Sequence, residues 1–178
     1  MVAAGCCNGT IHFMDAAAGQ IKSSVNVVYG EVERVHWSPC GTKIAAACND
    51  YVTDNYCVKI LNSETGALLC ALRGHTDPVR SVCFSPCGEK IASGGGDLRG
   101  NEDYSIRIWD AKTGEQIGSP LNVDVRTGFA EVWSVDWSPC GTMIAAACND
   151  DDSRLAGCVK ILNSETGALP CDLTGRTG

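Results

Sequence analysis

The sequence repeats itself at long range. The phrase WSPCGTKIAAACND at 37–50 returns at 137–150 with a single change, from Lys43 to Met143. A second phrase, CVKILNSETGAL, follows each copy without any change. Self-similarity of this kind indicates stacked, equivalent units, in which each unit buries its apolar faces against its neighbours.

The turn Ser-Pro-Cys-Gly marks the length of one unit. It recurs at 38–41, 85–88 and 138–141, so successive turns are 47 and 53 residues apart. Before each turn is an apolar run with polar interruptions, such as VRSVCF, and after it comes a run of small residues, such as KIASGGG. A third run rich in β-branched residues and a fourth, less regular run complete each unit, and no segment shows helical periodicity. The pattern predicts an all-β fold with four short strands per unit.

The middle unit resembles a WD repeat of the β-propeller family. Its text, GHTDPVRSVCFSPCGEKIASGGGDLRGNEDYSIRIWDAKTG, starts with Gly-His and ends its third run with Trp-Asp. The resemblance extends over essentially the whole chain and implies blades of four antiparallel strands, named a to d from the centre outward. The implied organisation is a partial blade at 1–27 with strands b, c and d, complete blades at 28–73 and 74–121, and a last blade within 122–178 that includes the start of a further repeat.

The resemblance also implies how the ends of the chain are handled. Propellers of this family close when one terminus completes the blade of the other, which leaves only short and protected edges. This sequence carries no strand for that purpose, so we expect an incomplete or open propeller that is a fragment of a longer one. The alternative is closure by association, for example two chains that form a ring of eight blades.

Charge and hydropathy exclude several classes of partner. The net charge of -7 and the pI near 4.8 argue against nucleic acid, because phosphate binding depends on clustered Lys and Arg. No apolar stretch approaches the roughly 20 residues that cross a bilayer, and no basic segment precedes the first apolar residues. We therefore expect a cytoplasmic protein, with the nucleus as the alternative, that binds neither nucleic acid nor membrane.

The twelve cysteines raise the question of disulfides and metal sites. The sequence contains no C-x-x-C pair, and the three histidines do not cluster with thiols. Most of the cysteines occupy repeat-equivalent positions, which predicts reduced thiols that serve as small buried fillers. We expect no metal and no cofactor, and keep a thiol-based redox or metal sensor as an alternative function.

Three residues of the middle unit are the types found in a nucleophilic triad: His75, Ser93 and Asp103. A hydrolase built on the propeller is therefore an alternative, although the sequence has no G-x-S-x-G elbow. The resemblance gives these residues another role, because together with Trp109 they occupy the four positions of the family's buried hydrogen-bond network. Leaving one buried partner unsatisfied would cost about 1–3 kcal/mol. We expect a structural network and no catalytic residues.

The other units have lost this signature. Residues without hydrogen-bonding side chains replace the network, which predicts apolar packing in place of a half-satisfied set of polar groups. Ala46 and Ala146 stand for the Ser, Leu61 and Leu162 for the Trp, Val28 and Gly128 for the His, and Ala4 and Met14 for the Ser and Trp of the partial blade.

The connections between strands b and c differ most among the units: NDYVTDNY, GDLRGNED and NDDDSRLAG. Variation that is concentrated on one face of a repeat protein indicates its binding face. On the same rim, one residue enters strand a in each complete unit, and Trp and Arg are common interface anchors. The candidate partner-binding residues are Glu33, Arg80, Trp133, Asp54, Arg99, Asp151 and Arg154.

These features predict a non-catalytic scaffold that presents its loop rim to protein or peptide partners, as WD-repeat proteins generally do; this step rests on the resemblance, because fold alone does not give function. We expect Arg80→Ala and Trp133→Ala to weaken binding of a partner with little change in thermal stability.

Overall fold

The computed structural model describes residues 1–96, 103–123, 130–150 and 157–174. Within them, fifteen strands form four antiparallel sheets, and the all-β prediction is confirmed. None of the described segments is a helix with the length and apolar character needed to cross a membrane. The strands are β1 Val2–Gly5, β2 Thr10–Asp15, β3 Gln20–Asn26, β4 Glu31–Trp37, β5 Lys43–Asp50, β6 Asn55–Asn62, β7 Leu68–Arg73, β8 Val79–Phe84, β9 Lys90–Gly95, β10 Ser105–Asp110, β11 Leu121–Asn122, β12 Ala130–Trp137, β13 Met143–Asp150, β14 Gly157–Asn163 and β15 Cys171–Thr174.

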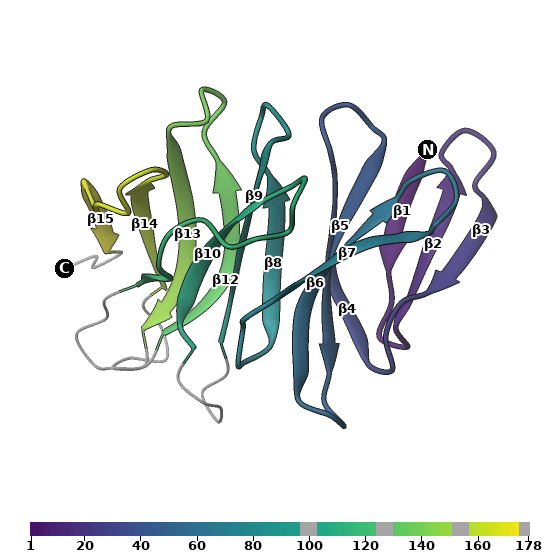
Figure 1. Cartoon of the computed structure of the whole chain (residues 1–178), viewed down its shortest axis with the longest axis horizontal. Coiled ribbons are helices and arrows are strands. Elements are labelled where there is room, and N and C mark those ends of the chain that lie inside the picture. The colour runs from purple at the N-terminus through teal and green to yellow at the C-terminus, as the bar shows by residue number, and fades with distance from the viewer. Residues whose placement is uncertain (97–102, 124–129, 151–156, 175–178) are drawn as a thin grey trace.

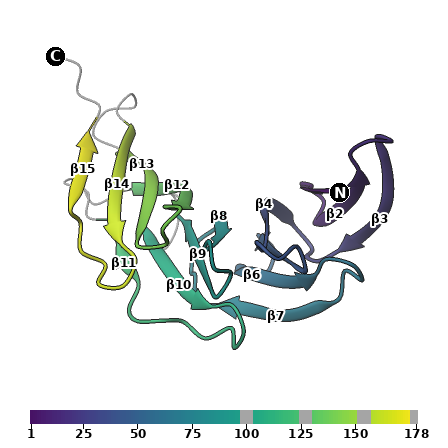
Figure 2. The same ribbon diagram turned by 90° about the horizontal axis from the view of Figure 1, so that it is seen from above.

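Each sheet is one blade whose strands are ordered as in the chain. Blade 1 consists of β1–β3, blade 2 of β4–β7, blade 3 of β8–β11 and blade 4 of β12–β15. Figure 1 shows the blades standing side by side, and Figure 2 shows that they follow an open arc. The first strands β4, β8 and β12 lie on the concave side of this arc, and the two chain ends lie at its opposite tips.

The Ser-Pro-Cys-Gly turns join the first two strands of blades 2, 3 and 4. In each turn the glycine N–H donates to the serine carbonyl, with N···O distances of 2.8, 2.9 and 2.8 Å for Gly41, Gly88 and Gly141. The φ angles of these glycines are 72°, 77° and 75°, in the left-handed region that residues with a Cβ rarely adopt. These turns lie on one rim of the arc, at the top of Figure 1, and the connection between β5 and β6 lies on the opposite rim.

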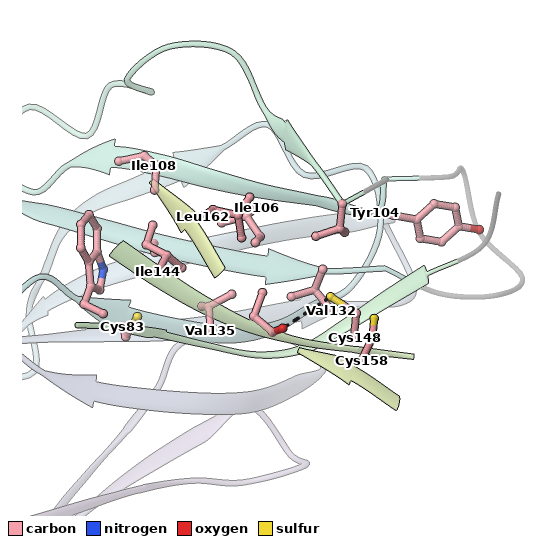
Figure 3. Packing of buried hydrophobic residues seen from close by; sticks show 14 residues of the cluster. Cys83, Tyr104, Ile106, Ile108, Val132, Val135, Ile144, Cys148, Cys158 and Leu162 are labelled. Carbon is pink, nitrogen blue, oxygen red and sulfur yellow. Dashed lines mark hydrogen bonds between the residues drawn. The ribbon is translucent and has the colours of Figure 1, made fainter. Parts of the chain in front are cut away.

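The core consists of three apolar layers, one between each pair of neighbouring blades. Successive side chains of a strand point to opposite faces of its sheet, so each middle strand serves two layers. Ala46 belongs to the layer between blades 1 and 2, whereas Ala45 and Ala47 belong to the layer between blades 2 and 3. Figure 3 shows the third layer, in which Ile106 and Ile108 of blade 3 face Ile144 and Leu162 of blade 4.

A buried amide joins blades 2 and 3. The Asn49 side chain is fully buried, accepts a hydrogen bond from the Val79 backbone N–H at 2.8 Å and donates to the Val79 carbonyl at 3.1 Å. Both backbone groups of Val79 are thus satisfied by one side chain of the neighbouring blade. This contact fixes the position of β8 relative to β5 along the strand direction.

Asn49→Ala should lower the free energy of unfolding by about 1–3 kcal/mol, because a buried N–H and a buried carbonyl would lose their partners. Urea denaturation followed by tryptophan fluorescence would measure the change. Asn55→Ala is the control, since Asn55 lies at the rim, where its side chain accepts a hydrogen bond from the exposed Arg73 guanidinium at 2.7 Å. Equal stability of the two variants would show that the Asn49 contact does not join the blades.

Candidate functional site

The structure brings His75, Ser93, Asp103 and Trp109 together as one buried network, called here the blade 3 network. Trp109 Nε1 donates to Ser93 Oγ at 2.8 Å, and Ser93 Oγ lies 2.8 Å from His75 Nε2. His75 Nδ1 lies 3.0 Å from Asp103 Oδ2. Because an indole can only donate and a carboxylate only accept, we assign the hydroxyl as donor to Nε2 and Nδ1–H as donor to Asp103.

Asp103 is bonded from several directions besides His75. Its carboxylate accepts the Thr76 backbone N–H at 2.9 Å and the Ser105 hydroxyl, and the Arg107 guanidinium lies 3.4 Å away. Burial opposes the ionised form of this carboxyl group, but the hydrogen bonds that it accepts from His75, Ser105 and Thr76 outweigh burial and hold the pKa of Asp103 well below its usual range. Asp103 is therefore the anionic centre of the network.

The blade 3 network links Ser, His and Asp by hydrogen bonds as a catalytic triad does, but a substrate cannot reach its serine. Ser93 has no exposed surface, and its oxygen already accepts the Trp109 N–H. The His75 side chain is also fully buried. A nucleophilic serine must reach its substrate and lie beside donors that stabilise an oxyanion. The geometry serves packing: it locks β9, β10 and the segment before β8 together.

Blades 2 and 4 fill the described equivalents of these positions with apolar side chains. In blade 2, Ala46 and Leu61 are buried in one layer together with Val28. In blade 4, Ala146 and Leu162 are buried in the layer shared with blade 3. Gly128, the remaining position of blade 4, lies outside the described residues. Blade 3 thus carries a polar set of residues at these positions, and the blades on either side of it carry an apolar set.

The candidate rim residues Glu33, Arg80 and Trp133 are equivalent in their sheets. Each is the extra residue of a β-bulge in the innermost strand of its blade, where the pairing register shifts across residues 32–34, 79–81 and 132–134. A bulge leaves its extra residue outside the ladder and redirects its side chain. We call these three residues the bulge row.

The bulge row is continuous across three blades. The guanidinium of Arg80 lies 3.0 Å from Glu33 Oε1 on one side and 5.4 Å from the centre of the Trp133 ring on the other. Its second nitrogen lies 4.0 Å from the carboxylate of Glu131, whose side chain is almost fully buried. Trp133 itself is 52% exposed, although it is a large apolar side chain. The row therefore presents an aromatic surface held in place by a paired cation.

The remaining candidate rim residues are not part of this row. Asp54 lies in the turn between β5 and β6, has a positive φ of 50° and accepts a hydrogen bond from the Tyr56 hydroxyl at 3.1 Å. Arg99, Asp151 and Arg154 lie outside the described residues.

The position of Arg80 changes what we expect of its substitution. Arg80→Ala would leave the buried Glu131 without this cation, because the guanidinium lies beside that carboxylate. On this geometry the change should lower stability as well as binding, whereas Trp133→Ala should affect binding alone.

Several participants in these contacts carry no clear signal in the sequence. Arg107 contacts Asp103 and also donates to Gln116 Oε1 at 2.9 Å, so it links the network to the outer part of blade 3. A basic residue does recur at this position, as Lys59 and Lys160, and this recurrence could have pointed to it. Glu131 and Asn49 could not be identified, because their partners belong to neighbouring blades.

Comparison with known proteins identifies the repeats. The family model "WD domain, G-beta repeat" matches residues 66–110 and 122–155. The structure superposes on a chain of the mitotic checkpoint complex crystal structure with a TM-score of 0.75, over 96% of this chain and 46% of that chain, at 17% identity. The repeats in these two stretches are WD40 repeats. The expected family is thereby confirmed.

Two curated proteins match at the level of sequence. The THO complex subunit 6 homolog of Danio rerio is 35% identical over 60 residues, which are 34% of this chain and 17% of the relative. Periodic tryptophan protein 2 of Saccharomyces cerevisiae is 30% identical over 112 residues, which are 63% of this chain and 10% of the relative. This WD40 chain thus spans only a small part of the length of either relative.

The thiols of this WD40 fold differ widely in burial. The twelve cysteines all carry thiols, of which five are buried and five are exposed, so the expectation of buried fillers is wrong for the turn cysteines. Hydrogen bonds with Ser38 and then Thr42 lower the pKa of Cys40 to about 7, and the same surroundings act on Cys140. Among the described residues, no three His, Cys, Asp or Glu side chains are grouped in a way that could hold a metal ion.

Proposed function

We propose that this WD40 chain is a non-catalytic scaffold that holds a protein or peptide partner on the rim where the bulge row lies. The observation that carries the proposal is the exposed Trp133 indole, kept in position by Arg80 across a blade boundary. An aromatic side chain with few rotatable bonds, fixed on rigid strands, loses little conformational entropy on binding. Trp and Arg are also the residue types that most often dominate interface energies.

Two further observations support a scaffold. The bulge row extends over blades 2, 3 and 4, so a partner that covers it contacts several repeats at once. One relative is a THO complex subunit homolog, and the solved structure is that of a mitotic checkpoint complex. We extend membership of protein complexes from those proteins to this chain. A cytoplasmic or nuclear location is part of the same proposal and is tested by localising the tagged protein in cells.

A hydrolase is the competing function, and burial argues against it. Ser93 has no exposed surface, and its oxygen is committed to Trp109 and His75. We propose that a fluorophosphonate probe for active-site serines leaves the folded chain unlabelled. Labelling of Ser93 in the native protein, located by mass spectrometry, would reverse this assignment.

Trp133→Ala should weaken binding of a rim partner by about 30-fold or more, since a hot-spot aromatic contributes at least about 2 kcal/mol. Peptides are first selected from a displayed library on the wild-type chain, and their Kd values are then measured for each variant. Leu169→Ala is the matched control, because Leu169 is 42% exposed and lies in the same blade away from the bulge row.

Thermal unfolding separates binding from folding. We expect Trp133→Ala and Leu169→Ala to lower stability by less than about 1 kcal/mol, as exposed substitutions generally do. Peptides that bind Trp133→Ala as tightly as the wild type, while competing with each other for one site, would place the binding surface elsewhere.

A further inference from the structure

The outward face of blade 4 has the same sequence as a face that blade 2 buries. In blade 2, the middle strands direct Ala45, Ala47, Val58 and Ile60 toward blade 3, and none of these side chains is more than 1% exposed. In blade 4 the equivalent residues are Ala145, Ala147, Val159 and Ile161; Val159 is 38% exposed and the other three are half-buried. The pairing is also the same, with Ala45 opposite Ile60 and Ala145 opposite Ile161.

Val159 and its equivalents are more exposed in blade 4 because no blade covers them, and not because blade 4 is built differently from blade 2. On the opposite face of the same two sheets, Ala46 and Ala146 are both fully buried, and Leu61 and Leu162 are 1% and 2% exposed. Blade 4 is therefore built like blade 2 and packs its inward face equally well. Its outward face lacks the cover that blade 3 gives to blade 2, because blade 4 stands at one end of the arc (Figure 2).

The chemistry of a suitable cover follows from blade 3. It covers blade 2 with Ile91 and Trp109 from its two middle strands, together with Val82 and Phe84 from its inner strand. Ile91 and Trp109 are opposite each other in the pairing of β9 with β10. The surface that packs on this face is thus an antiparallel sheet, with an aliphatic and an aromatic side chain at one pair of opposite residues.

Blade 1, at the other end of the arc, presents the matching half of such a contact. Val2 is opposite Met14 in the pairing of β1 with β2, at the register that Ile91 and Trp109 occupy in blade 3. Val2 is 43% exposed, whereas Ile91 is fully buried, and Met14 is only half-buried. One chain therefore carries the two complementary halves of a single kind of blade interface, both uncovered.

We propose that two copies of the chain associate head to tail, with the outward face of blade 4 of each copy against blade 1 of the other. The contact is made by β13 and β14 of one copy and β1 and β2 of the other, because the sheet of blade 1 consists of β1–β3 and has no inner strand among the described residues. Head-to-tail contacts form a closed ring when the rotation per copy fits. The blades of one copy follow an open arc (Figure 2), and a second arc placed against both of its ends would close a ring.

The mass of the whole chain in solution tests the proposal. Sedimentation velocity at micromolar concentrations should show a species of twice the 18.7 kDa monomer mass. Val159→Glu and Val2→Glu should each abolish it, because each places a carboxylate in one half of the apolar contact. Val52→Glu is the matched control: it is the same substitution at a residue that is 87% exposed in the β5–β6 turn, and it should remain dimeric.

Mixing the variants distinguishes the geometries. Equimolar Val159→Glu and Val2→Glu chains should regain a species of dimer mass, since each mixed pair keeps one intact head-to-tail contact. Circular dichroism of every variant confirms the β fold. A monomeric wild type, a dimer lost in Val159→Glu but kept in Val2→Glu, or growth into open filaments would each overturn the two-copy ring. None of these outcomes bears on peptide binding at the bulge row, which is measured separately with Trp133→Ala.

Discussion

Asp103→Asn should lower the free energy of unfolding at neutral pH by about 3–5 kcal/mol, the usual cost of removing one partner from a buried, hydrogen-bonded ion pair. The substitution keeps the shape of the side chain but removes its charge and places an NH₂ group among donors. Asp103 accepts from His75, Thr76 and Ser105 and faces Arg107, so several groups would lose their acceptor at once.

The same variant gives a pH signature. The folded pKa of Asp103 lies below the ordinary value of 3.8, so its contribution to stability is fully present well above pH 3.8 and is lost as the pH falls through that value toward the folded pKa. The difference in stability between wild type and Asp103→Asn should therefore be constant from pH 7 to about 5 and shrink below about pH 4.

Urea titrations at several pH values measure this difference. Asp54→Asn is the control, because Asp54 lies in an exposed turn and Asn tolerates its positive φ of 50°. A difference for Asp103→Asn that stays the same down to about pH 3 would mean that the carboxylate is not the anionic centre of the network.

Much of the fold could be predicted because its determinants are local in sequence. The recurring turn needs a glycine with positive φ, and the strands on either side have the right length and alternation. The blade 3 network could be named because the Gly-His and Trp-Asp signature fixes its members, as seen in the distances of Ser93 to His75 and Trp109.

The contacts between blades could not be predicted, because they depend on which residues meet across a sheet boundary. The position of Arg80 at the entry to strand a predicts a rim residue, but its link to Glu33 and Trp133 depends on bulges at equivalent positions in three blades. Asn49 has the pattern of an ordinary strand-end residue, yet it satisfies the Val79 backbone. Equivalent position was also a poor guide to the burial of the cysteines, since Cys40 repeats but is exposed.

Exchanging residues between the polar network of blade 3 and its apolar equivalents in blades 2 and 4 tests why the two sets occur in one chain. Trp109→Leu places in blade 3 the residue that blades 2 and 4 carry as Leu61 and Leu162. We expect it to cost about 3 kcal/mol, because it leaves a cavity and removes the donor to Ser93. Ser93→Ala should cost about 2 kcal/mol, since His75 and Trp109 both lose a buried partner.

The double variant should cost less than the sum of the two. Trp109 cannot lose a hydrogen bond to Ser93 twice, so Ser93→Ala with Trp109→Leu should fall short of additivity by about 1–2 kcal/mol. The reciprocal change Ala46→Ser buries a hydroxyl among Val28 and Leu61, and its cost measures the same mismatch in the apolar blade. Strict additivity, together with a neutral Ala46→Ser, would mean that each position tolerates either residue. Coupling in blade 3 together with a cost for Ala46→Ser would show that the position changes only as a set, which accounts for the apolar set that blades 2 and 4 share and the polar set that blade 3 carries.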